Sequence, residues 1–304
     1  MALNFLSQLI KNDRLLGQLV FRLVLGLIFI TSNTAFADNK PLYQVDSNLY
    51  YGDTSKPDKE LQSLDVYWQD NKAERPVIIY VHGGGWAFGD KSDVNLKPDF
   101  FLPQGFVFVS MNYRLRWDYK LYDQAEDLAH VVSWVRDHAK QYGIDKDKII
   151  LMGHESGAHL VSLVGTDGRY LKTQGLSLSN LKAVVAIDTL SYDVPRVLKE
   201  LGTFVQRRQH KLIFGEEKPV QLEASPIYHV KNNKNIPQFA LLYVPDNENT
   251  LIQTKAFAKS LREQEVNVIM IPGNAKTKQM LDVELGKVGD ISTIALIAFL
   301  RATL

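Results

Sequence analysis

Short apolar runs alternate along this chain with segments of helical pattern, and this alternation restricts the fold more than any other feature. Several runs are continuous and rich in β-branched residues, as expected for strands that helices cover on both faces of a parallel sheet. The predicted strands are 64–68, 77–81, 106–111, 149–152, 183–187, 239–244 and 266–271.

The intervening segments have helical spacing. Predicted helices span 123–142, 157–164, 250–264 and 291–304. In the first of them, apolar residues from Ala125 to Val135 recur three and four positions apart. The alternation predicts an α/β fold with a mostly parallel, doubly wound sheet flanked by helices. The polar, proline-broken stretch 190–234 is expected to form loops and short helices at a sheet edge, where pockets open.

Composition limits the class of protein further. The 304 residues are 45% hydrophobic and 23% charged, which is typical of a folded globular chain. The formal charge of +1 and the lack of a basic stripe give no reason to expect nucleic acid or an acidic membrane surface as a partner. Because there are no cysteines, thiol nucleophiles, disulfides and cysteine metal sites are excluded.

The N-terminus has the order of a secretory signal peptide. Basic residues up to Arg22 precede the apolar run 23–30, and an A-x-A site ends at Ala37. The run is too short for a spanning helix, which needs about 20 apolar residues. We therefore predict a signal peptide over 1–37, a single α/β domain over 38–304, and a periplasmic or secreted protein with no membrane span after cleavage. The sequence does not predict an oligomeric state.

The stretch His82-Gly83-Gly84-Gly85-Trp86 directly follows a predicted strand. Glycines here let the backbone approach a ligand and turn its N–H groups inward. Such groups form an oxyanion hole, which stabilises negative charge on a carbonyl oxygen. We predict that Gly84 and Gly85 contribute to such a hole, and that His82 supports the loop.

Residues 153–157 have the frame of a nucleophile elbow, G-x-S-x-G, but read G-H-E-S-G. Glu155 therefore occupies the nucleophile position, and Ser156 lies one residue late. A shift of one residue along a sharp turn moves a side chain away from the pocket. We expect Ser156 to be a packing residue whose backbone N–H completes the oxyanion hole.

Short motifs distributed over the chain, together with the HGGGW loop, carry a family resemblance. They are YGD at 51–53, LDVY at 64–67, NYRL at 112–115, GAHL at 157–160, DGRYL at 167–171 and YDVP at 192–195. From about residue 51 onward the chain resembles bacterial carboxylesterases related to feruloyl esterase, kynurenine formamidase and hormone-sensitive lipase. The resemblance implies an α/β-hydrolase fold and a Ser-Asp-His triad that cleaves esters or amides without a cofactor.

The resemblance also implies where the acid and base belong. Asp246 follows a predicted strand and matches the family's aspartate, with a register uncertain by a residue because Asn247 and Glu248 are adjacent. Lys278 falls where the family has its histidine, and none of the seven histidines lies beyond His229.

Two replacements thus coincide at the groups that must exchange a proton. A lysine with the ordinary pKa of about 10.4 is protonated at neutral pH and cannot act as a base. Opposite charges at these positions suggest a partly buried salt bridge between Glu155 and Lys278, within about 4 Å, because buried charges persist only when paired. Asp246 would be a second carboxylate near the ammonium.

Three functions remain open from the sequence. The first is a pseudoenzyme that binds a small-molecule ester, an anionic ligand or a partner, or that has only a structural role. The second is a hydrolase in which Glu155 is the nucleophile, as aspartate is in dehalogenases and epoxide hydrolases of this fold. The third is an esterase that uses Ser156 with a recruited histidine such as His154 or His159. Neither His154 nor His159 has metal-ligand spacing with a carboxylate, so no metal is expected.

Overall fold

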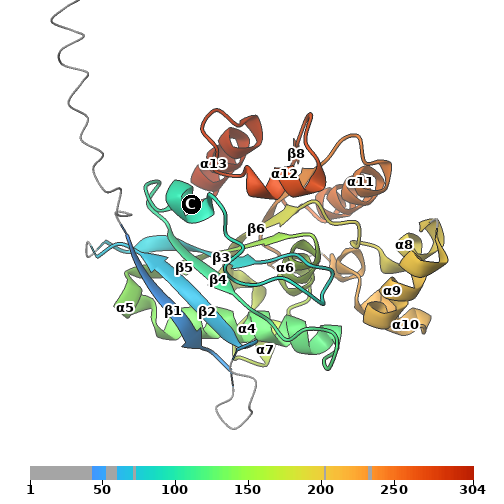
Figure 1. Ribbon diagram of the computed structural model, residues 1–304, viewed down its shortest axis with the longest axis horizontal. Coiled ribbons are helices and arrows are strands. Elements are labelled where there is room, and N and C mark those ends of the chain that lie inside the picture. The colour runs from blue at the N-terminus through green and yellow to red at the C-terminus, as the bar shows by residue number, and fades with distance from the viewer. Residues whose placement is uncertain (1–42, 53–59, 71–72, 202, 232–234) are drawn as a thin grey trace, which may run out of the picture. The chain divides into compact units, whose positions relative to one another are not determined.

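The computed structural model describes residues 43–52, 60–70, 73–201, 203–231 and 235–304, and the predicted signal peptide over 1–37 lies outside them. Within the described residues, eight strands form one sheet in the order β1-β2-β4-β3-β5-β6-β7-β8 (Figure 1). Strand β2 is antiparallel to β1 and β4, and the neighbours from β4 to β8 are parallel. The predicted mostly parallel α/β sheet is confirmed.

The observed strands overlap all the predicted ones and add an eighth. They are β1 Gln44–Tyr50, β2 Ser63–Trp68, β3 Arg75–Val81, β4 Val107–Met111, β5 Ile144–His154, β6 Leu181–Ile187, β7 Gln238–Tyr243 and β8 Val268–Pro272. The sequence analysis missed β1, which is an edge strand whose side chains are half-buried or exposed. It therefore has no continuous apolar run to reveal it.

Alternate side chains of the central strands enter two separate hydrophobic cores. In β3, Val77 and Ile79 belong to one core, and Ile78 and Tyr80 belong to the other. Because successive side chains of a strand point to opposite faces, each face must be covered. Figure 1 shows α4, α5 and α7 along one side of the sheet and α12 and α13 along the other.

The helices that the periodicity predicted are present with small shifts at their ends. They are α4 Leu121–Asp137 with α5 Ala139–Tyr142, α6 Ser156–Thr166, α11 Glu248–Glu263 and α13 Ile291–Thr303. Shorter elements were not predicted, because one or two turns give no measurable periodicity. These are α3 Lys97–Phe101, α7 Arg169–Lys172, η1 Leu178–Asn180 and α12 Lys278–Val283.

The stretch predicted to carry loops and short helices does so. It contains α8 Val194–Glu200, α9 Phe204–Phe214, α10 Lys218–Glu223 and the 3₁₀ turn η2 Pro226–His229. In Figure 1, α8, α9 and α10 gather at one end of the sheet. Helix α9 begins with a capping box, in which Thr203 accepts a hydrogen bond from the Gln206 N–H.

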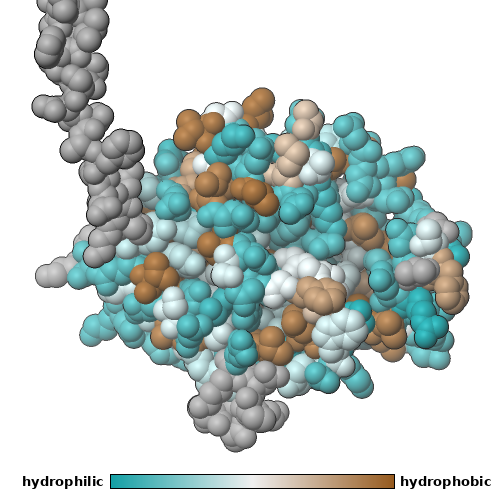
Figure 2. Space-filling model, in the orientation of Figure 1, coloured by the Kyte–Doolittle hydropathy of each residue, from teal (hydrophilic) through white to brown (hydrophobic). Residues whose placement is uncertain are grey.

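On the face shown in Figure 2, hydrophobic residues lie in small groups among hydrophilic ones. No helix in the described part of the chain is long and apolar enough to cross a membrane.

Candidate active site

Glu155 occupies the sharp turn between β5 and α6. Its backbone has φ 52° and ψ −108°, a conformation rare for residues other than glycine. The turn is anchored because the Glu155 N–H donates to the Ile187 carbonyl of β6 at 2.9 Å. The sequence frame 153–157 therefore folds as the predicted elbow, and it presents Glu155 at its apex.

The two glycines of the frame are required by close backbone contacts. A Cβ atom on Gly153 would lie 2.4 Å from the Gly157 carbonyl group. A Cβ atom on Gly157 would lie 2.1 Å from the Val81 carbonyl oxygen of β3. Both distances are impossible for real carbon atoms, so the strand and the helix can approach this closely only with glycine.

Ser156 lies below the elbow and not in the pocket. Its side chain is completely buried. Its Oγ atom is 3.3 Å from the Tyr113 hydroxyl, which is itself buried and donates to the His82 carbonyl. Ser156 is thus the packing residue that the elbow geometry predicted, and no base reaches it from the histidines of the described residues.

The Glu155 carboxylate has two partners. The Lys278 Nζ atom is 2.5 Å from Oε1, and the Gly84 N–H donates to Oε2 at 3.1 Å. The two side chains are 34% and 33% exposed, so the pair is partly buried. The predicted contact between Glu155 and Lys278 is confirmed, and an internal carboxylate occupies an amide of the predicted oxyanion hole.

Opposing influences set the pKa of Glu155. Burial alone would raise it, but the charge of Lys278, the hydrogen bond from Lys278 and the Gly84 amide together lower it below the ordinary value. Glu155 is therefore ionised at neutral pH. A carboxylate in this state has no proton to lose and is already satisfied by two donors.

The glycine loop forms a tight turn beside Glu155. Gly84 has φ 118°, and its carbonyl accepts hydrogen bonds from the N–H groups of Ala87 and Phe88. Gly85 has φ 61° and lines the same pocket as Glu155. His82 supports the loop as predicted, because its Nδ1 bonds to the Gly83 carbonyl at 2.7 Å and its ring stacks on Tyr113.

Asp246 does not join this ion pair. It is exposed, in the turn between β7 and α11, and no described residue forms a salt bridge with it within 4.0 Å. The adjacent Asn247 has its own role, since its side chain caps α11 by accepting from the Thr250 N–H. Asp246 keeps the chain position implied by the family, but the structure does not place it beside Lys278.

The charge of Lys278 acts on a different carboxylate, that of Asp188. Asp188 follows β6, is buried, and accepts a hydrogen bond from the Val244 N–H at 2.9 Å. Burial raises its pKa, while the charges of Lys278 and His154 oppose that rise. The sequence analysis missed Asp188. Its signal was a carboxylate at the carboxyl end of a predicted parallel strand, where ligands of α/β sheets bind.

A second ion pair involves the helix that carries Lys278. The Lys97 ammonium is fully buried, lies 2.8 Å from Asp282 Oδ1 and sits over the Tyr80 ring. Tyr80 donates to the same carboxylate at 2.9 Å. Asp282 is in α12, one turn after Lys278. The pair therefore fixes the helix from which Lys278 reaches Glu155, and the sequence analysis did not detect it.

The candidate histidines have separate positions. His159 is fully buried, and burial lowers its pKa to about 4, although the bond from its Nε2 to the Ala224 carbonyl at 2.8 Å opposes that change. His154 lies beside Asp282, with its Nδ1 3.9 Å from Oδ2. Neither lines the pocket in front of Glu155. His210 of α9 does line it, which was not predicted because no local pattern shows that α9 folds against this pocket.

The pocket in front of Glu155 has a volume of about 210 Å³. Apolar side chains form much of its wall, and titratable groups lie among them. The apolar residues include Trp86, Phe88, Leu190 and Ile213, and the titratable residues are Arg116, Glu155, His210 and Lys278.

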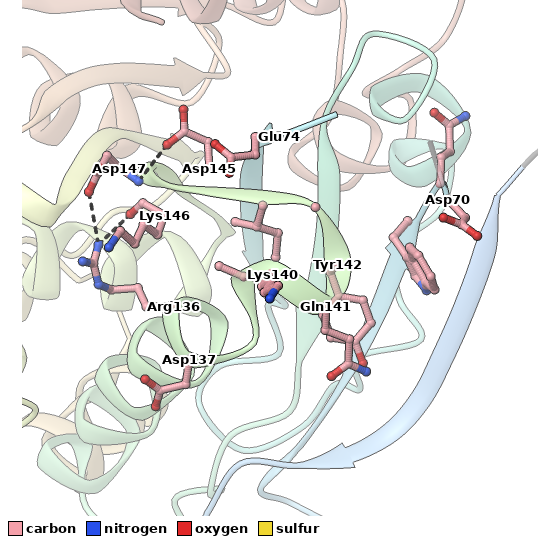
Figure 3. Close-up of a pocket in the computed structure, with 15 residues that line it drawn as sticks. Asp70, Glu74, Arg136, Asp137, Lys140, Gln141, Tyr142, Asp145, Lys146 and Asp147 are labelled. Atoms are coloured by element: carbon pink, nitrogen blue, oxygen red, sulfur yellow. Dashed lines mark hydrogen bonds and ion pairs between the residues drawn. The ribbon is translucent and has the colours of Figure 1, made fainter. Parts of the chain in front are cut away.

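A larger cavity of about 710 Å³ lies elsewhere, around the start of β5 (Figure 3). Its labelled side chains are mostly charged, and Arg136 there binds the Lys146 carbonyl and pairs with Asp147. Ligands of parallel sheets bind at the carboxyl ends of strands. This cavity is at the amino end of β5, so the smaller pocket beside Glu155 is the candidate active site.

The sheet order, the elbow and the glycine loop define an α/β-hydrolase of the esterase type. Comparison with protein-family models agrees, because the BD-FAE model matches residues 64–261, more than half of the chain. The chain belongs to the BD-FAE family.

Curated relatives are esterases. A probable isoprenylcysteine alpha-carbonyl methylesterase of Arabidopsis thaliana is 26% identical over 78% of this chain and 52% of its own length. An arylesterase of Saccharolobus solfataricus is 24% identical over 73% of this chain and 76% of its own. The chain spans about half the length of the Arabidopsis relative and of a probable carboxylic ester hydrolase of Mycobacterium tuberculosis.

Solved structures share the fold. Esterase B of Lactobacillus rhamnosis superposes with a TM-score of 0.70 at 22% identity, over 86% of this chain and 85% of that one. A truncated carbohydrate esterase from gut microbiota gives a TM-score of 0.70 at 19% identity, over 87% of this chain and 98% of that one.

Proposed function

We propose that this protein binds a small ligand in an esterase pocket and does not carry out serine-dependent ester hydrolysis. The observation that supports this most strongly is the chain of contacts from Lys278 through Glu155 to the Gly84 amide. We also propose that the protein is exported, because 1–37 has the pattern of a signal peptide.

The side chains at this site do not supply the groups that the first step of serine-dependent hydrolysis needs. A serine hydrolase needs a hydroxyl at the elbow and a base that removes its proton. Here the elbow carries an ionised carboxylate, and the base position carries an ammonium that is already donating to it. Ser156 offers no substitute, because its hydroxyl is buried against Tyr113.

Stabilisation of a tetrahedral intermediate is also obstructed. The amide of an oxyanion hole contributes only when it is available to the substrate oxygen. The Gly84 N–H donates to Glu155 Oε2, so a substrate carbonyl would have to displace a charged internal acceptor. Charge-assisted hydrogen bonds are stronger than neutral ones, which makes that exchange unfavourable.

A second candidate function is hydrolysis through a covalent Glu155 ester, favoured by one observation, that His210 lines the same pocket. In this reaction a Glu155 oxygen would attack an electrophilic carbon and expel the leaving group. A water, after losing a proton to His210, would then cleave the new ester. Intact mass after incubation with an alkyl halide or epoxide tests it. An adduct on Glu155, or catalytic release of halide or diol, supports this function, and an unmodified protein that releases no product excludes it for those reagents.

The main test compares turnover of short p-nitrophenyl esters by the wild type, Glu155→Ser, Lys278→His and the double variant. We expect no turnover above the uncatalysed rate for the wild type and both single variants, because each lacks a nucleophile or a base. Activity should appear only in the double variant. Turnover by the wild type that Ser156→Ala abolishes would contradict the proposal and establish an esterase that uses Ser156.

A further inference from the structure

The pocket in front of Glu155 retains one uncompensated positive charge. Lys278 is neutralised by Glu155. His210 is predominantly neutral at neutral pH, because burial lowers its pKa. Arg116 lines the pocket as well, and no described carboxylate lies within 4.0 Å of its guanidinium. An arginine is always charged, so the pocket attracts an anion at this point.

Arg116 is held in place without an acidic partner. Its guanidinium lies 4.1 Å from the centre of the Trp117 ring. Trp117 is fixed in turn, because its Nε1–H donates to the Ala87 carbonyl at 3.0 Å and its ring packs against Phe88. Both aromatic rings are largely exposed, so this group forms the rim of the pocket. A stacked guanidinium is pre-organised to bind a carboxylate.

A second observation points to a ligand independently. Ser191 lines the pocket and is only 1% exposed, yet its hydroxyl has no hydrogen-bond partner in the structure. Leaving a buried hydroxyl unpaired costs free energy, and most such groups in proteins are bonded. A polar atom of a bound molecule would satisfy it.

The remaining lining and the size restrict the ligand further. Trp86, Leu190 and Ile213 offer apolar contacts. The volume of about 210 Å³ is below the range of roughly 300–1,000 Å³ that is usual for drug-sized ligands. The pocket therefore fits a compact molecule with an apolar body and one anionic group.

We propose, on the basis of the proposed function, that the pocket binds a small amphipathic monocarboxylate. The carboxylate of this ligand pairs with Arg116, and its apolar body lies against Trp86, Leu190 and Ile213. The anion points toward the rim, because Glu155 already occupies both the Lys278 ammonium and the Gly84 amide at the elbow. Ser191 donates or accepts a hydrogen bond with the ligand.

Isothermal titration calorimetry with 3-phenylpropionate and hexanoate tests this proposal on the wild type and on Arg116→Gln, Arg116→Lys and Ser191→Ala. Arg208→Gln in α9 is the matched control, because Arg208 is an exposed arginine outside the pocket lining. Loss of a charge-assisted contact should weaken binding by at least about tenfold in Arg116→Gln. Arg116→Lys should retain part of the affinity, and Ser191→Ala should lose about threefold.

The neutral analogue 3-phenylpropionamide has nearly the same shape and should bind the wild type at least about tenfold more weakly than the acid. Equal binding of acid and amide, or equal affinity of the wild type and Arg116→Gln, would overturn the proposal. So would absence of binding up to about 10 mM, which corresponds to less than about 3 kcal/mol. Ester turnover by the same samples contradicts the proposed function instead, so the two failures are distinguishable.

Discussion

Glu155 combines a strained backbone with a well-satisfied side chain. A residue other than glycine at positive φ costs about 1–3 kcal/mol. In a serine hydrolase this strain exposes the nucleophile. Here the same turn directs a carboxylate to Lys278 and to the Gly84 amide. The geometry of the elbow is kept, and the side chain at its apex forms an ion pair.

A double-mutant cycle measures the strength of that pair. Glu155→Gln, Lys278→Met and the double variant should show a coupling of about 1–2 kcal/mol in the free energy of unfolding. This lies between the values for exposed and buried pairs, because each side chain is about one-third exposed. Urea denaturation monitored by circular dichroism gives the four free energies. Effects that add to within about 0.3 kcal/mol would show that the contact contributes nothing.

The same pair predicts a dependence of stability on pH. Folding lowers the pKa of Glu155, so its contribution is complete above the ordinary value of 4.5 and is lost as the pH falls through the lower folded value. The difference in unfolding free energy between wild type and Glu155→Gln should therefore shrink between about pH 6 and about pH 3. Other titrating groups cancel in this difference. A gap that stays constant or widens toward acid pH would show that the pKa is not lowered.

Helix α12 determines where Lys278 lies. This helix has only six residues and is capped by Thr277, which accepts from the Met280 N–H. Short helices are not stable by themselves. The buried pair of Lys97 and Asp282 ties α12 to α3, and Tyr80 adds a hydrogen bond from β3. The position of the Lys278 ammonium thus depends on the buried ammonium of Lys97, which belongs to α3.

Removing that charge should destabilise the protein strongly. Lys97→Met leaves the Asp282 carboxylate buried without its cation, which we expect to cost about 3–5 kcal/mol. Lys97→Met with Asp282→Asn should recover part of this loss, because no unpaired charge remains. The control Lys259→Met affects an exposed helical pair and should change stability by about 0.5 kcal/mol or less. Thermal and urea unfolding of the wild type and the three variants give the free energies of unfolding. A loss under 1 kcal/mol for Lys97→Met would show that the buried pair does not hold α12 in place.

Across the whole molecule, the sequence predicted those features that depend on a local residue pattern or on a residue's position relative to the family motifs. Short apolar runs, several of them continuous, revealed the strands from β2 to β8, and the glycine frame revealed the elbow. Chain position implied that Glu155 and Lys278 meet, although they are 123 residues apart. These features follow from periodicity, from glycine geometry and from the rule that buried charges need partners.

The features that the sequence did not predict depend on tertiary partners. Lys97 and Asp282 are 185 residues apart, and nothing local distinguishes a buried lysine from a solvated one. Asp188 and Asp246 both follow strands, but only the folded chain shows that Asp188 is buried and Asp246 exposed. Arg116 and His210 reach the pocket from a loop and from α9, whose paths no periodicity determines.

We expect the wild-type site to contain no activated nucleophile. Reaction with a fluorophosphonate, followed by intact mass and peptide mapping, tests this directly, because the reagent forms a bond only with an activated hydroxyl. We predict that the wild-type protein keeps its original mass, while the variant with Glu155→Ser and Lys278→His gains one phosphonyl group at residue 155. A phosphonyl adduct on Ser156 of the wild-type protein would show instead that the site holds an activated hydroxyl.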